Sequence, residues 1–145
     1  MEFSRTINAK PDRVWDMLWG KDTYKKWTSP FAEGSDAETD WKQGSKIIFH
    51  DGSGSGMVSR VEKSEPPRYL GITHLGFVKD GVEDYDSDEV KPWAGSYENY
   101  TLTENNGKTD LKVELGGAEI PQEHVEHFEK AWPKALDILQ ELAER

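Results

Sequence analysis

The sequence predicts an α+β fold in which an antiparallel sheet packs against one long C-terminal helix. Three observations carry this prediction. Apolar residues recur at spacings of three and four from residue 121 to about residue 143, which is the period of a helix with one buried face. Much of the preceding chain alternates apolar and polar residues, as half-buried strands do. Glycine-containing turn signals separate these alternating segments and favour hairpins.

The C-terminal helix is the longest element that the sequence predicts. About 23 residues at 1.5 Å each give a rod of roughly 35 Å, long enough to cross a small domain. Because the chain before it reads mainly as strand, we expect its apolar stripe to be buried against the sheet. The stripe consists of Val125, Phe128, Trp132, Ala135, Leu136, Leu139 and Leu142.

The N-terminal third predicts one strand followed by two short helices. Apolar and polar residues alternate over residues 2–7, which indicates the first strand. Pro11 suits the first position of a helix, where its missing N–H costs nothing, and Gly20 suits the end of that helix. A second short helix is expected at residues 22–27, and Pro30 follows its end.

The central and C-terminal segments predict about six further strands in antiparallel order. Strands are expected at residues 46–50 and 57–63, which a glycine-rich hairpin connects, and at 69–78 after the break at Pro66-Pro67. Residues 80–89 contain six acidic side chains in ten and are expected to form a solvated loop. Strands at 97–104 and 109–115 should form a last hairpin, because Asn106-Gly107 is a strong turn signal.

Composition indicates a single domain over residues 1–145 and disfavours several classes of function. The chain has no cysteine, so disulfides and zinc–thiolate sites are excluded. A net charge of −10 disfavours nucleic acid and anionic membrane surfaces as partners. Neither a signal segment nor a membrane span is recognisable, so we expect a cytoplasmic protein. Six Trp, five Tyr and five Phe favour either a lined pocket or, as the commoner case, dense packing.

Short segments spread over nearly the whole chain resemble the START/Bet v 1-like superfamily (also called SRPBCC), and within it the branch of the activator of Hsp90 ATPase homologue 1. Each segment is weak alone, but their order and spacing together are specific for the fold. They are residues 5–11 (RTINAKP), 14–15 (VW), 24–27 (YKKW), 40–49 (DWKQGSKIIF), 56–58 (GMV), 66–67 (PP) and Trp132 in the last helix.

The resemblance implies a helix-grip fold, in which a curved antiparallel sheet wraps around the long helix and leaves a cavity between them. Members bind lipids, sterols, polyketides or other hydrophobic molecules there, and a minority catalyse cyclisation or dehydration. The preferred hypothesis is therefore a domain that binds a small hydrophobic ligand without a cofactor. Two alternatives stay open: an interaction module that acts on a chaperone related to Hsp90, and a cyclase- or dehydratase-type enzyme.

The strand alternation predicts which strand residues face the helix, and the helix adds Phe128, Trp132 and Leu136. We assign six of them to the cavity and to ligand binding: Trp41, Phe49, His74, Tyr100, Phe128 and Trp132. The other inward positions, expected to be core, are Ile47, Leu70, Ile72, Leu102, Leu111, Val113, Leu115 and Leu136.

Three polar residues also fall on inward positions, namely Arg5, His74 and Glu98. A buried charge is costly unless it is paired, so these residues are expected to meet partners or water. Glu98 with His74 could act as a general acid–base pair, although a structural ion pair or a wet cavity wall is the commoner arrangement. The four histidines show no metal-ligand spacing, and no metal is predicted.

Overall fold

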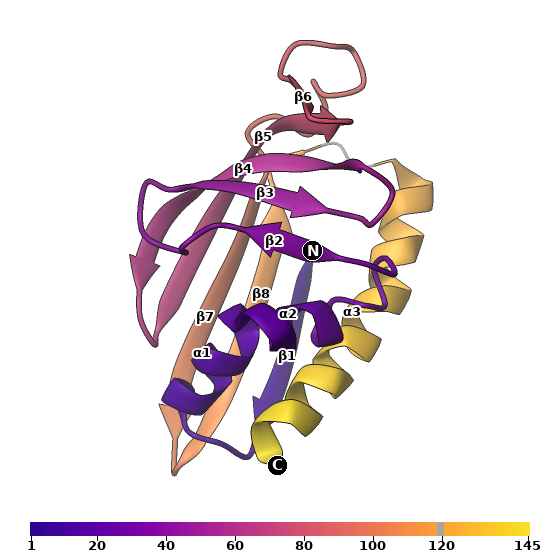
Figure 1. Ribbon diagram of the computed structural model, residues 1–145. Coiled ribbons are helices and arrows are strands. Elements are labelled where there is room, and N and C mark those ends of the chain that lie inside the picture. The colour runs from indigo at the N-terminus through magenta and orange to yellow at the C-terminus, as the bar shows by residue number, and fades with distance from the viewer. Residues whose placement is uncertain (119–120) are drawn as a thin grey trace.

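The computed structural model describes residues 1–118 and 121–145, and these residues form an α+β helix-grip fold (Figure 1). One eight-stranded antiparallel sheet has the order β1-β8-β7-β5-β4-β3-β2, and β6 pairs with the end of β5. The elements are β1 (Glu2–Ile7), α1 (Pro11–Trp19), α2 (Lys21–Trp27), β2 (Asp36–Glu38), β3 (Lys46–His50), β4 (Ser55–Glu65), β5 (Tyr69–Lys79), β6 (Val82–Asp84), β7 (Tyr97–Asn105), β8 (Lys108–Gly116) and α3 (Gln122–Glu144).

The Asn106-Gly107 turn joins β7 and β8, where the sequence predicts a hairpin. Asn106 and Gly107 have φ values of 53° and 82°, and Asn105 pairs with Lys108 across the β7–β8 hairpin. A two-residue turn with both φ angles positive matches the twist of the flanking strands, and Asn-Gly is its preferred sequence. The predicted last hairpin is therefore confirmed.

The two short helices are also confirmed, and Gly20 joins them. Its φ of −65° is not left-handed, so glycine is required here for another reason. A Cβ at this position would lie 2.7 Å from the carbonyl oxygen of Asp16, in the last turn of α1. The glycine lets α2 begin directly after α1, which places both helices beside α3 on the same side of the sheet (Figure 1).

Helix α3 buries most of the predicted apolar stripe, from Trp132 to Leu142, whereas Val125 and Phe128 are half-buried. Trp132, Leu136 and Leu139 join buried residues of β1, β3, β4, β5, β7 and β8 in one continuous core. Arg5 of β1, predicted to face inward, lies at the sheet edge beside α3. Its guanidinium donates to Asp137 Oδ1 at 2.6 Å and to Gln140 Oε1 at 3.0 Å, so its charge is paired across the interface between β1 and α3.

One prediction about the fold is wrong. The acidic segment 80–89 is not wholly a loop, because β6 (Val82–Asp84) adds a short strand to the sheet beside β5. Asp80 and Gly81 form its hairpin turn with φ values of 50° and 82°. Asp-Gly is a recognised hairpin signal. The six acidic side chains of the segment led to the prediction of a loop instead. Lys46 of β3 also pairs with Glu83 at 2.6 Å, which offsets part of the acidic repulsion.

Candidate functional site

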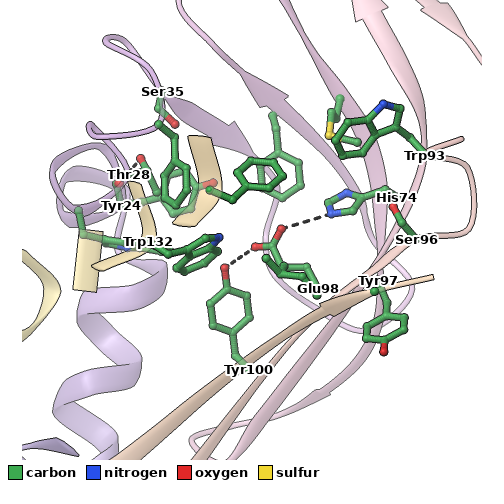
Figure 2. A pocket seen from close by; sticks show the side chains of 17 residues that line it. Tyr24, Thr28, Ser35, His74, Trp93, Ser96, Tyr97, Glu98, Tyr100 and Trp132 are labelled. Carbon is green, nitrogen blue, oxygen red and sulfur yellow. Dashed lines mark hydrogen bonds and ion pairs between the residues drawn. The ribbon is translucent and has the colours of Figure 1, made fainter. Parts of the chain in front are cut away.

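A cavity of about 190 Å³ lies between the sheet and the helices α2 and α3 (Figure 2). Side chains from α2, the segment after it, β3, β4, β5, the segment before β7, β7, β8 and α3 form its wall. Most of the wall is aromatic, and the half-buried or exposed rings mark the side that reaches solvent. The aromatic residues are Tyr24, Trp27, Phe31, Phe49, Trp93, Tyr97, Tyr100, Phe128 and Trp132.

Five of the six side chains predicted for the ligand site lie in this wall: Phe49, His74, Tyr100, Phe128 and Trp132. Trp41 does not. Its ring packs on Trp19 with a centroid distance of 4.4 Å, outside the cavity. Trp41 has a φ of 59° and precedes β3, so the alternation of strand residues does not extend to it.

Sequence reasoning missed several aromatic residues of the wall. Tyr24 and Trp27 are three positions apart on α2, and this helical spacing could have placed both on the covered face. Phe31 and Trp93 lie in irregular segments, where no period indicates direction. Trp93 contacts Phe128 of α3 at a centroid distance of 6.4 Å, so the segment before β7 closes one side of the cavity.

A chain of polar side chains crosses the cavity wall (Figure 2). The Tyr100 hydroxyl donates to Glu98 Oε2, and Glu98 Oε1 lies 3.2 Å from His74 Nε2. His74 Nδ1 lies 2.7 Å from Ser59 Oγ. Tyr100, Glu98 and His74 line the cavity, whereas Ser59 is fully buried and does not.

The hydrogen-bond distances are compatible with one fully satisfied assignment of protons. If His74 Nε2–H donates to Glu98, then Nδ1 accepts from the Ser59 hydroxyl, and every member is satisfied with a neutral imidazole. Burial raises the pKa of Tyr100 well above its ordinary value, and the nearby Glu98 carboxylate adds to this shift. Tyr100 therefore remains a donor at neutral pH, and Glu98 receives one donor on each carboxylate oxygen.

This arrangement limits the chemistry of the site. Ser59, His74 and Glu98 have the residue types of a nucleophilic triad, but Ser59 has 0% exposure and does not line the cavity. A ligand cannot reach its hydroxyl, so acyl transfer through Ser59 is excluded. Glu98 faces the cavity and could exchange a proton with a ligand, so the acid–base role predicted for Glu98 and His74 stays a hypothesis.

Ser96 adds a second polar group to the wall. It is 4% exposed, and its hydroxyl has no hydrogen-bond partner within residues 1–118 and 121–145. Ser96, Glu98 and Tyr100 alternate along β7 and the residue before it, and all three line the cavity. An unpartnered buried hydroxyl is uncommon in folded proteins and marks a position where a bound molecule could bond.

The described residues contain neither a group of metal-ligand side chains nor a helix suited to a membrane. In the part of the chain that the structure describes, no three His, Asp or Glu side chains gather as metal ligands would. None of the helices described there has the length and apolar character needed to cross a membrane.

Known structures share this architecture. The Aha1 dimer from Colwellia psychrerythraea, solved in solution, matches with a TM-score of 0.75 and 19% identity, over 99% of this chain and 95% of that chain. Protein MLL2253 from Mesorhizobium loti gives 0.73 and 17%, over 98% and 94%. CalU16 from Micromonospora echinospora gives 0.67 and 21%, over 98% and 74%. At these identities the similarity shows the fold alone.

No curated protein matches the chain. A family model does match it, and this match identifies the family, which the structures at these identities do not. The family model described as "Activator of Hsp90 ATPase homolog 1-like protein" matches residues 8–144, which span α1 to α3 with most of the sheet. The match agrees with the helix-grip fold and with the resemblance seen in the sequence. The chain therefore belongs to the activator of Hsp90 ATPase homologue 1-like family.

Proposed function

We propose that this protein binds a small hydrophobic molecule non-covalently in the cavity between the sheet and α3. The observation that carries the proposal is the aromatic wall, in which rings from α2, β3, β7 and α3 converge on an unfilled space. Ligand sites are typically concave and apolar, with a few placed polar groups. Glu98, His74 and Ser96 supply such groups.

The size of the cavity indicates the size of the ligand. An apolar cavity of about 150 Å³ holds a benzene molecule. The present cavity of about 190 Å³ therefore suits one ring with a short substituent. Apolar burial would supply roughly 25 cal/mol for each Å² removed from water.

Calorimetric titration with ethylbenzene tests this proposal. The protein should bind the probe, and Leu115→Trp should abolish binding because the larger side chain fills the cavity from β8. Lys112→Trp is the matched control, since residue 112 faces the opposite side of the same strand. Equal binding by both variants, or no binding by the unchanged protein, would refute a site in this cavity.

The family and one of its structural neighbours favour a second function, an interaction with an Hsp90-type chaperone. The matching solution structure is named as an Aha1 dimer, and the family is named for activation of Hsp90 ATPase. Addition of this protein to an Hsp90 chaperone, with ATP hydrolysis as the readout, distinguishes the two functions. Stimulation that Leu115→Trp leaves intact would favour the chaperone function over a cavity ligand.

A further inference from the structure

The cavity wall contains one carboxylate, Glu98, and the one basic side chain in the described lining is His74, whose Nε2 lies 3.2 Å from it. Of the seventeen residues that line the space, Glu98 is the only carboxylate, and Lys and Arg are absent from the described lining. The Glu98 side chain is 19% exposed, so folding has already removed most of its water. A poorly hydrated carboxylate is stabilised when a ligand places its own positive charge beside it.

The hydrogen bonds around Glu98 hold the carboxylate without cancelling its charge. Tyr100 donates a neutral hydroxyl proton, and in the tautomer in which Nδ1 accepts from Ser59, His74 is neutral and donates Nε2–H to Glu98. Each carboxylate oxygen can accept a further hydrogen bond from the cavity. Figure 2 shows Glu98 between Tyr100 and His74, with Trp132 beside Tyr100. The wall therefore offers acceptors for a donor-rich group.

The aromatic rings favour the same kind of ligand. The face of an aromatic ring attracts a cation within about 6 Å of its centroid, most strongly when water is excluded. Tyr24, Tyr100 and Trp132 line the cavity with Glu98, and the Tyr100 hydroxyl donates to the Glu98 carboxylate. The unpartnered Ser96 hydroxyl supplies another acceptor.

From these observations we infer that the ligand is an organic cation, a protonated amine on a ring-sized apolar body, with Glu98 as its counter-ion. The inference rests on the proposed function and specifies the chemistry of its ligand. The ammonium lies against the Glu98 carboxylate, and the apolar body lies among the rings. Anionic molecules of the same size are rejected, because a second carboxylate beside Glu98 adds like-charge repulsion in a poorly hydrated space.

Four probes of nearly equal shape test the inference at neutral pH: 2-phenylethylamine, 2-phenylethanol, ethylbenzene and phenylacetate. Calorimetry should rank the amine first, about tenfold or more tighter than the alcohol, because a charge-assisted hydrogen bond is roughly twice as strong as a neutral one. Phenylacetate should bind most weakly. An amine that binds no tighter than the alcohol would overturn the inference.

Glu98→Gln keeps the shape of the side chain and removes its charge, so the amine should lose its advantage while ethylbenzene keeps its affinity. Glu104→Gln, an exposed change on the same strand, is the control and should leave the ranking unchanged. An amine preference that survives Glu98→Gln contradicts the inference. If none of the four probes binds, the proposed function itself fails; if ethylbenzene binds but the amine does not, only the inference fails. The ranking by the unchanged protein decides the matter even if the variant does not fold.

Discussion

The Ser59 hydroxyl, which has 0% exposure, is hydrogen-bonded to His74 Nδ1, and His74 Nε2 in turn is hydrogen-bonded to the Glu98 carboxylate. Ser59 lies on β4 and His74 on β5, and the two residues are register partners in the sheet. Glu98 reaches the same histidine from β7. Three neighbouring strands thus position one carboxylate at the cavity. The strand alternation predicted His74 and Glu98 as inward residues, but it gave no indication that Ser59 would support them.

Ser59→Ala should lower the free energy of unfolding by about 1–3 kcal/mol, because it leaves a buried imidazole nitrogen without a partner. Chemical denaturation measures this change. In a His74→Leu background the same substitution should cost much less, since no imidazole remains to be satisfied. Equal costs in both backgrounds would show that the hydrogen bond between Ser59 and His74 contributes nothing.

The buried tyrosines predict a loss of stability at alkaline pH. Burial raises the pKa of Tyr24 and of Tyr100 above the ordinary value of 10.0, and the nearby Glu98 adds to both shifts. The unfolded chain therefore loses these phenolic protons first, so the stabilisation is complete below pH 10.0 and falls as pH rises above it. Denaturation midpoints at pH 8 and pH 11 should differ less in Tyr24→Phe and Tyr100→Phe than in the unchanged protein. Tyr97→Phe, at an exposed residue, is the control.

At the scale of elements, the β3–β4 hairpin depends on one close backbone approach. Gly56 of β4 pairs with His50 of β3, and a Cβ at Gly56 would lie 1.6 Å from the carbonyl oxygen of Phe49. The glycine-rich sequence 51–56 predicted the connection, but the sequence does not show which glycine is sterically required. That requirement arises from the partner strand, which local sequence does not describe.

Gly56→Ala should destabilise the protein more strongly than Gly107→Ala. At Gly107 nothing lies within 4 Å of an added Cβ, and the only penalty is its φ of 82°, about 1–2 kcal/mol. At Gly56 the strands must separate to admit the methyl group, which also displaces the cavity residue Phe49. Thermal unfolding of the two variants measures the difference. A Gly56→Ala protein as stable as Gly107→Ala would refute the close approach.

For the molecule as a whole, sequence patterns predicted the layers better than the space between them. The period of α3, the alternation of β7 and β8, and the Asn106-Gly107 turn are local signals, and the structure confirms the elements they predict. The cavity is different, because irregular segments complete it. Phe31 and Trp93 lie in such segments. Trp41 has a left-handed backbone conformation, and its side chain does not line the cavity. No periodicity describes these positions.

Trp132 packs against four other rings, and its removal should cost more than removal of a half-buried ring of the wall. It is 4% exposed and stacks on Phe3 at 5.7 Å, with Phe31 at 4.9 Å and Tyr100 at 6.2 Å. Trp132→Ala should lower the free energy of unfolding by about 3–5 kcal/mol. Trp93→Ala, at a half-buried ring of the same cavity, should cost clearly less. Similar costs for both would contradict a core centred on Trp132.

The proposed function depends above all on a space between sheet and helix that admits an apolar ligand. An NMR titration of the isotopically labelled protein with ethylbenzene tests this most directly, because backbone and side-chain shifts report the position of the probe. The proposed function predicts saturable shifts concentrated at Phe49, His74, Tyr100, Leu115 and Trp132, all of which line the cavity. Saturable shifts confined to the outward positions of β7 and β8, or no saturable shifts, would contradict it.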